Sequence, residues 1–407
     1  MRNDRLDRLA EFPFRRLAAL LAGEPAPAGP AFDLSIGEPK HAPPHLLAET
    51  VAAHAHLWNR YPPVNGTPEF RAAAAAWLTR RFGLPSHVLD PERMILPLAG
   101  TKEGLYLLPS VVVPADRSGP KPVVLMPDPV YAVYYGAAVM AGAEPVLLPA
   151  TAASGFLPDL EALSPALLAR TALFYLCTPA NPQGAVADRD YLRRAVRLAR
   201  EYDFLLAVDE CYSELWDAAP PPGALEAAWA EDGSFANVVV LHSLSKRSSA
   251  PGLRSGFIAG DPELLARLLR LRAYGSPVQP LPLMAAATVL WQDETHVEAN
   301  RALYREKFDL AERRLAGRFG FYRPAGGFFL WLDVGDGEAA CRRLWREAGV
   351  KVLPGGYLSA GADAAGTNPG APFVRVALVD RIELVDRALE RFAEVLGEAS
   401  RPRAAAS

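Results

Sequence analysis

One lysine of the chain, Lys246, stands in a setting that suits covalent chemistry. It lies in residues 237–260, NVVVLHSLSKRSSAPGLRSGFIAG, where an apolar run stops in Ser-Leu-Ser-Lys. A strand that ends there would deliver the ammonium group to a buried position, where loss of hydration and nearby cations lower the pKa of a lysine. Such a lysine can form a Schiff base with a carbonyl compound.

The same stretch carries groups that suit a phosphate. Ser243 and Ser245 offer hydroxyl groups, and Arg254 offers a planar guanidinium fork. A phosphate beside a Schiff-base lysine describes a pyridoxal phosphate site. The alternative is a turn whose lysine and arginine are simply solvated, so the rest of the chain must supply the partners.

Length and composition predict a globular protein with more than one domain. The chain has 407 residues, 50% hydrophobic and 22% charged, with a formal net charge of -3. It lacks the basic excess that nucleic-acid binding needs, the apolar core of a signal peptide, and an apolar run of ~18 residues that could span a bilayer. Three separated cysteines, Cys177, Cys211 and Cys341, indicate neither a disulfide framework nor a zinc site. We therefore expect a cytoplasmic protein with no nucleic-acid or membrane partner.

Seven apolar runs predict the strands of one large sheet. They occupy residues 94–98, 123–126, 145–148, 172–177, 204–208, 238–241 and 257–259. Continuous apolar runs that alternate with amphipathic helices indicate an α/β fold with a mainly parallel sheet between helices. Ligands of such sheets bind beyond the carboxyl ends of the strands.

The first run is followed by a candidate anion site. Gly100, Thr101 and Lys102 turn from this strand into a helix, so the amides of Gly100 and Thr101 would face an anion at the helix N-terminus. The sequence matches neither G-x-x-x-x-G-K-[ST] nor G-x-G-x-x-G, and neither motif occurs elsewhere. Nucleotide triphosphate and dinucleotide sites therefore lose their usual support.

Three later runs end in residues that suit a flat, charged cofactor. Tyr131 could stack on its ring, and Asn181, between two prolines, is a fixed amide donor. Asp209 ends the fifth run, where a buried carboxylate is tolerable only if a cation meets it. A protonated pyridine nitrogen would be that cation.

Other candidates lie outside the sheet. Tyr61 is presented on stiff prolines and could reach a ligand, and Gly37 could let a ligand approach the backbone. Arg375 interrupts an apolar strand, so its partner is either a structural or a substrate carboxylate. His41, His45, His54 and His56 lack a carboxylate or thiol at ligand spacing, so no metal site is expected.

The pattern changes beyond the large sheet. Residues 263–315 predict a helical region that is broken near 275–282, and strands at 326–333 and 372–378 flank a helix at 339–349. We predict four parts: an N-terminal arm with part of the small domain at 1–50, a large cofactor-binding domain at 51–295, a smaller α+β domain at 296–396 and a disordered tail at 397–407.

Together, these motifs resemble the class I/II pyridoxal-phosphate-dependent aminotransferases of fold type I, from about residue 33 to residue 392. Within that group, YPPVNGTPEFR, TPANPQGAV and LHSLSKRSSAPGLRSGF are most similar to bacterial N-succinyldiaminopimelate aminotransferases.

The resemblance implies a role for each candidate residue. Lys246 would be the Schiff-base lysine, Asp209 the partner of the pyridine nitrogen, and Asn181 and Tyr212 the donors to the cofactor phenolate. Arg375, with Gly37 and Asn181, would bind the substrate. The remaining cofactor contacts would be Gly100, Thr101, Lys102, Tyr131, Ser243, Ser245, Arg254 and Tyr61. Many family members carry Ser-Gly-Gly or Ser-Gly-Thr where this chain has Ala99-Gly100-Thr101, so one phosphate hydroxyl is in doubt.

The resemblance also implies a homodimer with a shared active site, in which Tyr61 reaches the phosphate of the neighbouring subunit. The reaction would move an amino group between glutamate and an oxoacid, N-succinyl-2-amino-6-oxopimelate of lysine and diaminopimelate biosynthesis. Alternatives are another class I/II aminotransferase acting on aspartate, alanine or aromatic amino acids, and a pyridoxal-phosphate β-lyase. A regulatory DNA-binding relative and an exported solute-binding protein lack their sequence signals.

Overall fold

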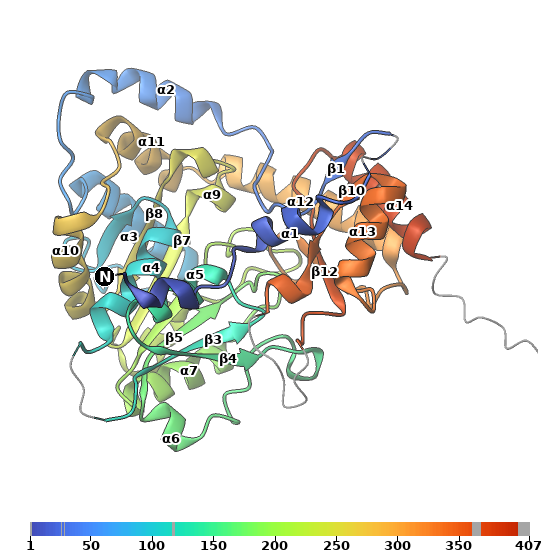
Figure 1. Ribbon diagram of the computed structural model, residues 1–407. Helices are drawn as coiled ribbons and strands as arrows, with labels where there is room; N and C mark the ends of the chain where they lie inside the picture. The colour runs from blue at the N-terminus through green and yellow to red at the C-terminus, as the bar shows by residue number, and fades with distance from the viewer. Residues whose placement is uncertain (1, 26, 28, 116–118, 360–367, 398–407) are drawn as a thin grey trace, which may run out of the picture.

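The computed structural model describes residues 2–25, 27, 29–115, 119–359 and 368–397. In these residues a seven-stranded sheet forms the centre of the larger domain (Figure 1). Its strands, in spatial order, are β2 (Ile95–Leu98), β8 (Gly256–Gly260), β7 (Val238–Ser243), β6 (Leu205–Asp209), β5 (Thr171–Cys177), β3 (Val123–Asp128) and β4 (Glu144–Pro149). Here β8 runs antiparallel to both neighbours and the other pairs are parallel. The predicted α/β fold with a mainly parallel sheet is confirmed.

Alternate side chains of the strands enter two different cores, which is why the strands read as continuous apolar runs. Val123 and Leu125 face one core, while Val124 and Met126 face the other. Helices α3 (Pro68–Phe82), α7 (Arg189–Glu201), α8 (Ala224–Asp232) and α11 (Leu281–Gln292) cover the first face. Helices α4 (Thr101–Val112), α5 (Ala132–Met140) and α10 (Pro262–Gly275) cover the second.

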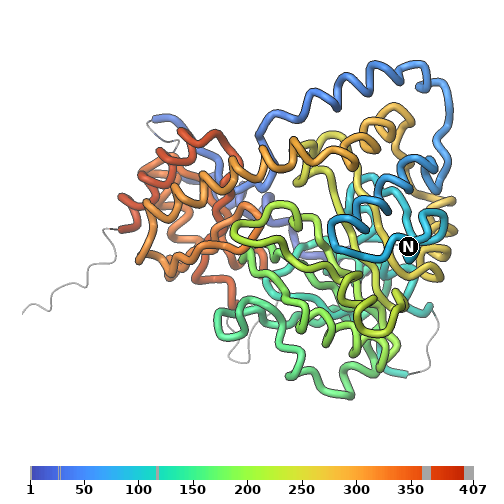
Figure 2. The backbone as a smooth tube through the Cα atoms, turned by 180° about the vertical axis from the view of Figure 1, so that it is seen from behind, coloured from blue at the N-terminus to red at the C-terminus, as the bar shows by residue number. Residues whose placement is uncertain are grey.

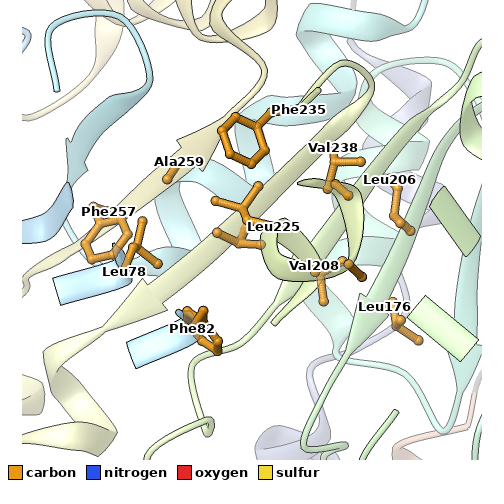
Figure 3. Close-up of a cluster of buried hydrophobic side chains, with 14 of the residues drawn as sticks. Leu78, Phe82, Leu176, Leu206, Val208, Leu225, Phe235, Val238, Phe257 and Ala259 are labelled. Carbon is orange, nitrogen blue, oxygen red and sulfur yellow. The ribbon is translucent and has the colours of Figure 1, made fainter. Parts of the chain in front are cut away.

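Figure 3 shows part of the first core, where strand side chains such as Val208, Val238 and Phe257 share one cluster with helix side chains such as Leu78, Phe82 and Leu225. Each fully buried Val, Leu or Phe side chain stabilises the fold by about 1.5–3 kcal/mol. This packing holds the strand ends in place. It therefore provides the rigid frame on which the site is built.

The smaller domain has its own core. There β12 (Phe373–Ala377) lies between β11 (Leu353–Pro354) and β9 (Phe329–Asp333), antiparallel to both. Around them lie α12 (Thr295–Leu315), α13 (Gly337–Ala348) and α14 (Ile382–Gly397). The N-terminal part of the chain returns to this core: α1 (Pro13–Leu21) packs on α13 and β11, and β1 (Phe32–Asp33) pairs with β10 (Val350–Lys351).

Helix α12 joins the two domains. Its Asn300 bonds to the main chain of the large domain at Lys246, and its Arg314 pairs with Asp386 in α14. Figure 2 shows this orange helix running from the large domain into the small one. The predicted boundary at 295/296 therefore falls at the beginning of a continuous helix.

Some predicted ranges differ from the structure. The region 263–315 is three helices, α10, α11 and α12, and α13 ends at Ala348 because Gly349 adopts a left-handed backbone with φ 67°. Residues 45–50 belong to α2 (His45–Ala53), which packs on α11 of the large domain. Gly397 ends α14, and residues 398–407 of the predicted tail lie outside the described residues.

The short helices are α6 (Pro165–Leu168), α9 (Leu244–Arg247), η1 (Asp4–Arg8), η2 (Ala55–Leu57), η3 (Ala152–Ser154), η4 (Pro251–Leu253) and η5 (Gly355–Tyr357). No helix among the described residues has the length and apolar character needed to cross a membrane.

Candidate active site

A cavity of about 240 Å³ lies beyond the carboxyl ends of the parallel strands. It brings together many of the predicted site residues: Gly37, Thr101, Tyr131, Asn181, Asp209, Tyr212, Lys246 and Arg375. These residues are spread over more than 330 positions of the sequence, from Gly37 to Arg375, and come from both domains. The strand ends and the small domain together therefore build one site.

Lys246 lies in α9, immediately after β7. Its Nζ donates a hydrogen bond to the carbonyl oxygen of Gly37 at 2.7 Å and lies 5.2 Å from the ring centre of Phe328. Burial lowers the pKa of Lys246 from 10.5 to about 8, and the nearby Arg375 cation contributes to the lowering. Near neutral pH, a useful fraction of this amine is therefore available in the uncharged, nucleophilic form.

Gly37 must be a glycine for this contact. A Cβ at position 37 would lie 2.4 Å from Cζ of Phe329, so a side chain there would displace the wall of the cavity. The backbone of residue 37 can therefore approach Lys246 closely.

Asp209 ends β6 and is 4% exposed. The Tyr134 hydroxyl donates to Oδ2 at 2.8 Å, and the Cys211 amide donates to Oδ1 at 3.2 Å. Burial raises the pKa of Asp209, and no cation of the described residues forms an ion pair with it within 4.0 Å. A buried carboxylate with neutral donors gains from a positive charge placed beside it.

Strand register explains how the predicted phosphate ligands meet. Gly256, at the beginning of β8, pairs with Leu98 on one side and with Ser243 on the other. The carboxyl ends of β2 and β7 are therefore held on either side of β8. The segments that follow these strands carry Gly100, at the N-cap of α4, and Lys246, in α9.

A glycine allows the arginine to enter this corner. Gly100 has φ 84° and is the N-cap of α4, and a Cβ there would lie 2.3 Å from Nη2 of Arg254. That nitrogen donates to the carbonyl oxygen of Ala99 at 3.1 Å. Ser243 caps α9 by accepting from the Ser245 amide at 3.1 Å. Free helix amides and a guanidinium group thus stand together, as an anion requires.

Arg375, in β12, is buried without a carboxylate. It is 5% exposed, its Nη2 donates to the Ser35 carbonyl at 2.8 Å, and its Nη1 donates to Oδ1 of Asn181 at 3.2 Å. Among the described residues its Nε has no hydrogen-bond partner, and burial lowers the pKa of Arg375 to about 10. The sequence left two alternatives for the partner of Arg375, a structural carboxylate or a substrate carboxylate. Among the described residues, no carboxylate lies within 4.0 Å of this guanidinium. The guanidinium is thus available for the carboxylate of a ligand.

Two further predicted cofactor contacts, the ring-stacking Tyr131 and the phenolate donor Tyr212, are tyrosines in the cavity wall. Tyr131 meets Tyr134 edge to face, with ring centres 5.5 Å apart, and Tyr212 packs edge-on against Phe328 at 5.4 Å. Burial raises the pKa of both tyrosine hydroxyls. Both therefore remain hydrogen-bond donors at neutral pH.

Several predicted residues do not line the cavity itself. Gly100, Ser243, Ser245 and Arg254 lie in the adjoining strand-end corner. The Lys102 side chain is exposed, with Nζ 5.7 Å from the ring centre of Phe12, because successive helical residues point about 100° apart. Tyr61 is fully exposed. The cofactor roles of these residues remain predictions.

The structure also adds residues that the motifs did not reveal. Phe12, which precedes α1, and Phe14, in its first turn, line the cavity, as do Ile36 and Glu38. Nothing in the local sequence indicates that residue 12 reaches the far end of the sheet. Tyr134 had a detectable signal, since it follows Tyr131 by three residues and shares its helix face.

These residues fit pyridoxal phosphate. Asp209 has no cation within 4.0 Å among the described residues, Gly100 and Arg254 would form a cradle for a phosphate, and Lys246 is a half-buried amine that lines the cavity. Bound here, the cofactor supplies the electron sink for negative charge at the α-carbon of an amino acid.

Comparisons with known proteins identify the family of the chain. Residues 30–392 match the family model of aminotransferase class I and II. The chain is 34% identical over 402 residues to LL-diaminopimelate aminotransferase of Desulforudis audaxviator (strain MP104C), covering 97% of both chains.

Solved structures show the same relationship. An aminotransferase from Neisseria meningitidis Z2491 is 39% identical, with a TM-score of 0.91 over 97% of this chain and 100% of that one. A probable N-succinyldiaminopimelate aminotransferase from Thermus thermophilus is 29% identical, with a TM-score of 0.79 over 94% and 99%. The chain belongs to the class I and II aminotransferases, enzymes that depend on pyridoxal phosphate.

Proposed function

We propose that the protein moves an amino group between glutamate and N-succinyl-2-amino-6-oxopimelate in lysine and diaminopimelate biosynthesis. The observation that carries an amino-acid substrate is Arg375, a buried guanidinium without a carboxylate partner in the described residues, in the same cavity as Lys246 and Asp209. Because an arginine fork matches a carboxylate in geometry and charge, the α-carboxylate of each substrate would bind there.

The proposed roles follow from the positions of the side chains. Lys246, as the free amine, would take the proton from the α-carbon of the substrate and return it to the cofactor. Asp209 would hold a proton on the pyridine nitrogen by its charge. Arg375 would fix the α-carboxylate so that the α-proton faces the amine.

The diaminopimelate series is favoured by two relatives. One is named LL-diaminopimelate aminotransferase and the other probable N-succinyldiaminopimelate aminotransferase. Unmodified diaminopimelate and its N-succinyl derivative differ at the end away from the reacting amine. The two substrates must therefore be separated by assay.

The far end of such a substrate needs a group beyond the described cavity residues. The basic side chains among the described cavity residues are Lys246 and Arg375, which already have the roles of Schiff-base lysine and α-carboxylate ligand in this proposal. We propose that a second copy of the chain supplies the rest in a homodimer, and that Tyr61 reaches the phosphate in the partner's site. Support comes from exposed aromatic side chains: Tyr61 is 100%, Tyr274 88% and Trp58 54% exposed.

A second candidate has its own support. Phe12, Phe14 and Ile36 form an apolar part of the cavity lining. Such a wall suits an amino acid with an apolar or aromatic side chain, as in the aromatic aminotransferases.

A half-reaction screen separates the candidates. The purified protein with bound cofactor is mixed with N-succinyl-LL-diaminopimelate, LL-diaminopimelate, glutamate, phenylalanine or alanine, and the absorbance of the lysine-bound cofactor is followed. Glutamate and the succinyl compound should react fastest. Faster reaction with phenylalanine would favour the second candidate, and release of pyruvate and ammonia from a β-substituted alanine would indicate a lyase.

A further inference from the structure

A side-chain amide outside the cavity binds the main chain of Lys246. Nδ2 of Asn300, in α12, donates to the carbonyl oxygen of Lys246 at 3.1 Å and to that of Arg247 at 3.4 Å. Helix α9 has only four residues, so its last carbonyl groups have no helical partner. Asn300 satisfies them and so fixes the turn that carries the lysine.

His41 sets the orientation of that amide. Because Nδ2 of Asn300 faces two carbonyl groups, its Oδ1 must face His41, whose Nδ1 lies 2.7 Å away. This pattern assigns the hydrogen to Nδ1 of His41. The other ring nitrogen, Nε2, then accepts from Nζ of Lys307 at 2.6 Å.

Lys307 is an unusual donor for this position. It is 2% exposed, and within the described residues no carboxylate pairs with it at 4.0 Å or less. Burial lowers the pKa of Lys307 to about 8, and burial lowers that of His41 also. An ammonium that donates to Nε2 disfavours a proton on the same nitrogen, so the tautomer with hydrogen on Nδ1 is retained.

The segment that carries His41 also contacts the reactive end of the lysine. Gly37 accepts from Nζ of Lys246 at 2.7 Å, and Ser249 Oγ donates to the His41 carbonyl at 2.8 Å. Lys40, between them, pairs with Asp380, which follows the strand of Arg375. This short segment therefore contacts Nζ of Lys246 directly, reaches the carbonyl group of Lys246 through Asn300, and pairs with the small domain.

We propose that Asn300, oriented by His41 and Lys307, is a positioning residue that aligns Lys246 for proton transfer. The proposal rests on the assignment of Lys246 as the Schiff-base lysine. None of the three side chains lines the cavity in the described residues, so each acts through another group.

Two substitutions of His41 form a matched pair. His41→Asn places an amide nitrogen near the former Nδ1 and keeps the donor to Asn300, whereas His41→Gln places it near Nε2 and loses that donor. Each variant is loaded with pyridoxal phosphate, and the absorbance of the bound cofactor is titrated against pH. Turnover, KM and thermal unfolding are measured in parallel.

We expect His41→Gln and Asn300→Ala to shift the titration and to lower kcat by roughly 10–100-fold with KM little changed, because misalignment acts on proton transfer. In His41→Asn, both the cofactor titration and kcat should stay close to those of the wild type. Lys307→Met should give a smaller shift than His41→Gln, since His41 can keep its hydrogen on Nδ1.

Wild-type titration in folded His41→Gln, or equal defects in the Asn and Gln variants, would overturn the proposal. If His41→Gln does not fold, the comparison of Asn300→Ala with Lys307→Met decides, and a larger shift in Lys307→Met would contradict the proposal. Absence of a titrating cofactor band in the wild type would instead refute the role of Lys246.

Discussion

Lys246 is half-buried and Lys307 is buried, and loss of hydration lowers the pKa of each from 10.5 to about 8. Lys246 faces a cavity that also contains Asp209 and Arg375, whereas Lys307 faces the imidazole of His41 inside the protein. A lowered pKa therefore does not by itself identify the Schiff-base lysine. Lys246 differs from Lys307 in two ways. It lines a cavity with space for pyridoxal phosphate, and side chains that suit the ring and the phosphate of this cofactor lie nearby.

The largest expected effect on activity comes from replacing Lys246, with a replacement of Lys307 for comparison. Lys246→Ala should abolish transamination and the absorbance of lysine-bound cofactor, because no other amine lines the cavity in the described residues. Lys307→Met is the matched control and should still bind the cofactor covalently. Near-native turnover in Lys246→Ala would show that the two lysines have been assigned the wrong way round.

The next effect concerns the carboxylate that distinguishes the surroundings of Lys246. Asp209→Asn should keep the fold but lower single-turnover α-proton removal on the order of 10²–10³-fold, because an amide cannot stabilise a protonated ring by charge. The control is Glu210→Gln, which removes the charge of the next carboxylate in the chain. Glu210 is also buried, at 1% exposed, but it lies 3.0 Å from His242 inside the protein and does not line the cavity.

Glu210→Gln should lower stability more than turnover, because it replaces a buried carboxylate that lies beside His242 and accepts from the Ala224 amide. Equal rates of proton removal in Asp209→Asn and the wild type, measured by stopped-flow absorbance, would exclude the role of Asp209.

Arg375 provides the third test. Arg375→Ala should weaken the half-reactions of glutamate and of the long substrate alike, by roughly 2–5 kcal/mol in kcat/KM if the charge pair is desolvated. Arg375→Lys keeps a charge but loses the fork, so its loss should be intermediate. A defect confined to one of the two substrates would argue against a shared α-carboxylate site.

The smallest effect is on stability and depends on pH. The folded pKa of Lys307 is about 8 against an ordinary 10.5, so between these values the unfolded chain binds more protons. The wild-type free energy of unfolding should therefore gain a rising contribution with pH across this window. Lys307→Met lacks this contribution, so any stability advantage of the variant below pH 8 should shrink towards pH 10.5. Denaturant unfolding of the cofactor-free proteins at several pH values would measure it, and parallel curves would contradict it.

The sequence predicted the frame of the site well because the frame depends on local signals. Buried parallel strands must be apolar on both faces, so their runs were visible in the sequence. Strand ends then place Lys246 and Asp209 at one edge of the sheet.

Contacts between distant segments could not be predicted in this way. Phe12 reaches the cavity because α1 packs on the small domain, and His41 meets Lys307 across 266 positions of sequence. No periodicity encodes such pairs. Lys102 shows that a local motif can also mislead. The motif indicates correctly that a helix begins there, but the turn of the helix decides where each side chain points.

The assignment of Lys246 can be tested most directly by reduction of the protein with its bound cofactor. Borohydride converts the Schiff base into a stable amine, and proteolysis with mass spectrometry then locates the labelled lysine. We expect the label on the peptide that contains Lys246, with Lys307 unmodified. A label on Lys307 or on another lysine, or no label in a protein that retains transaminase activity, would contradict the assignment.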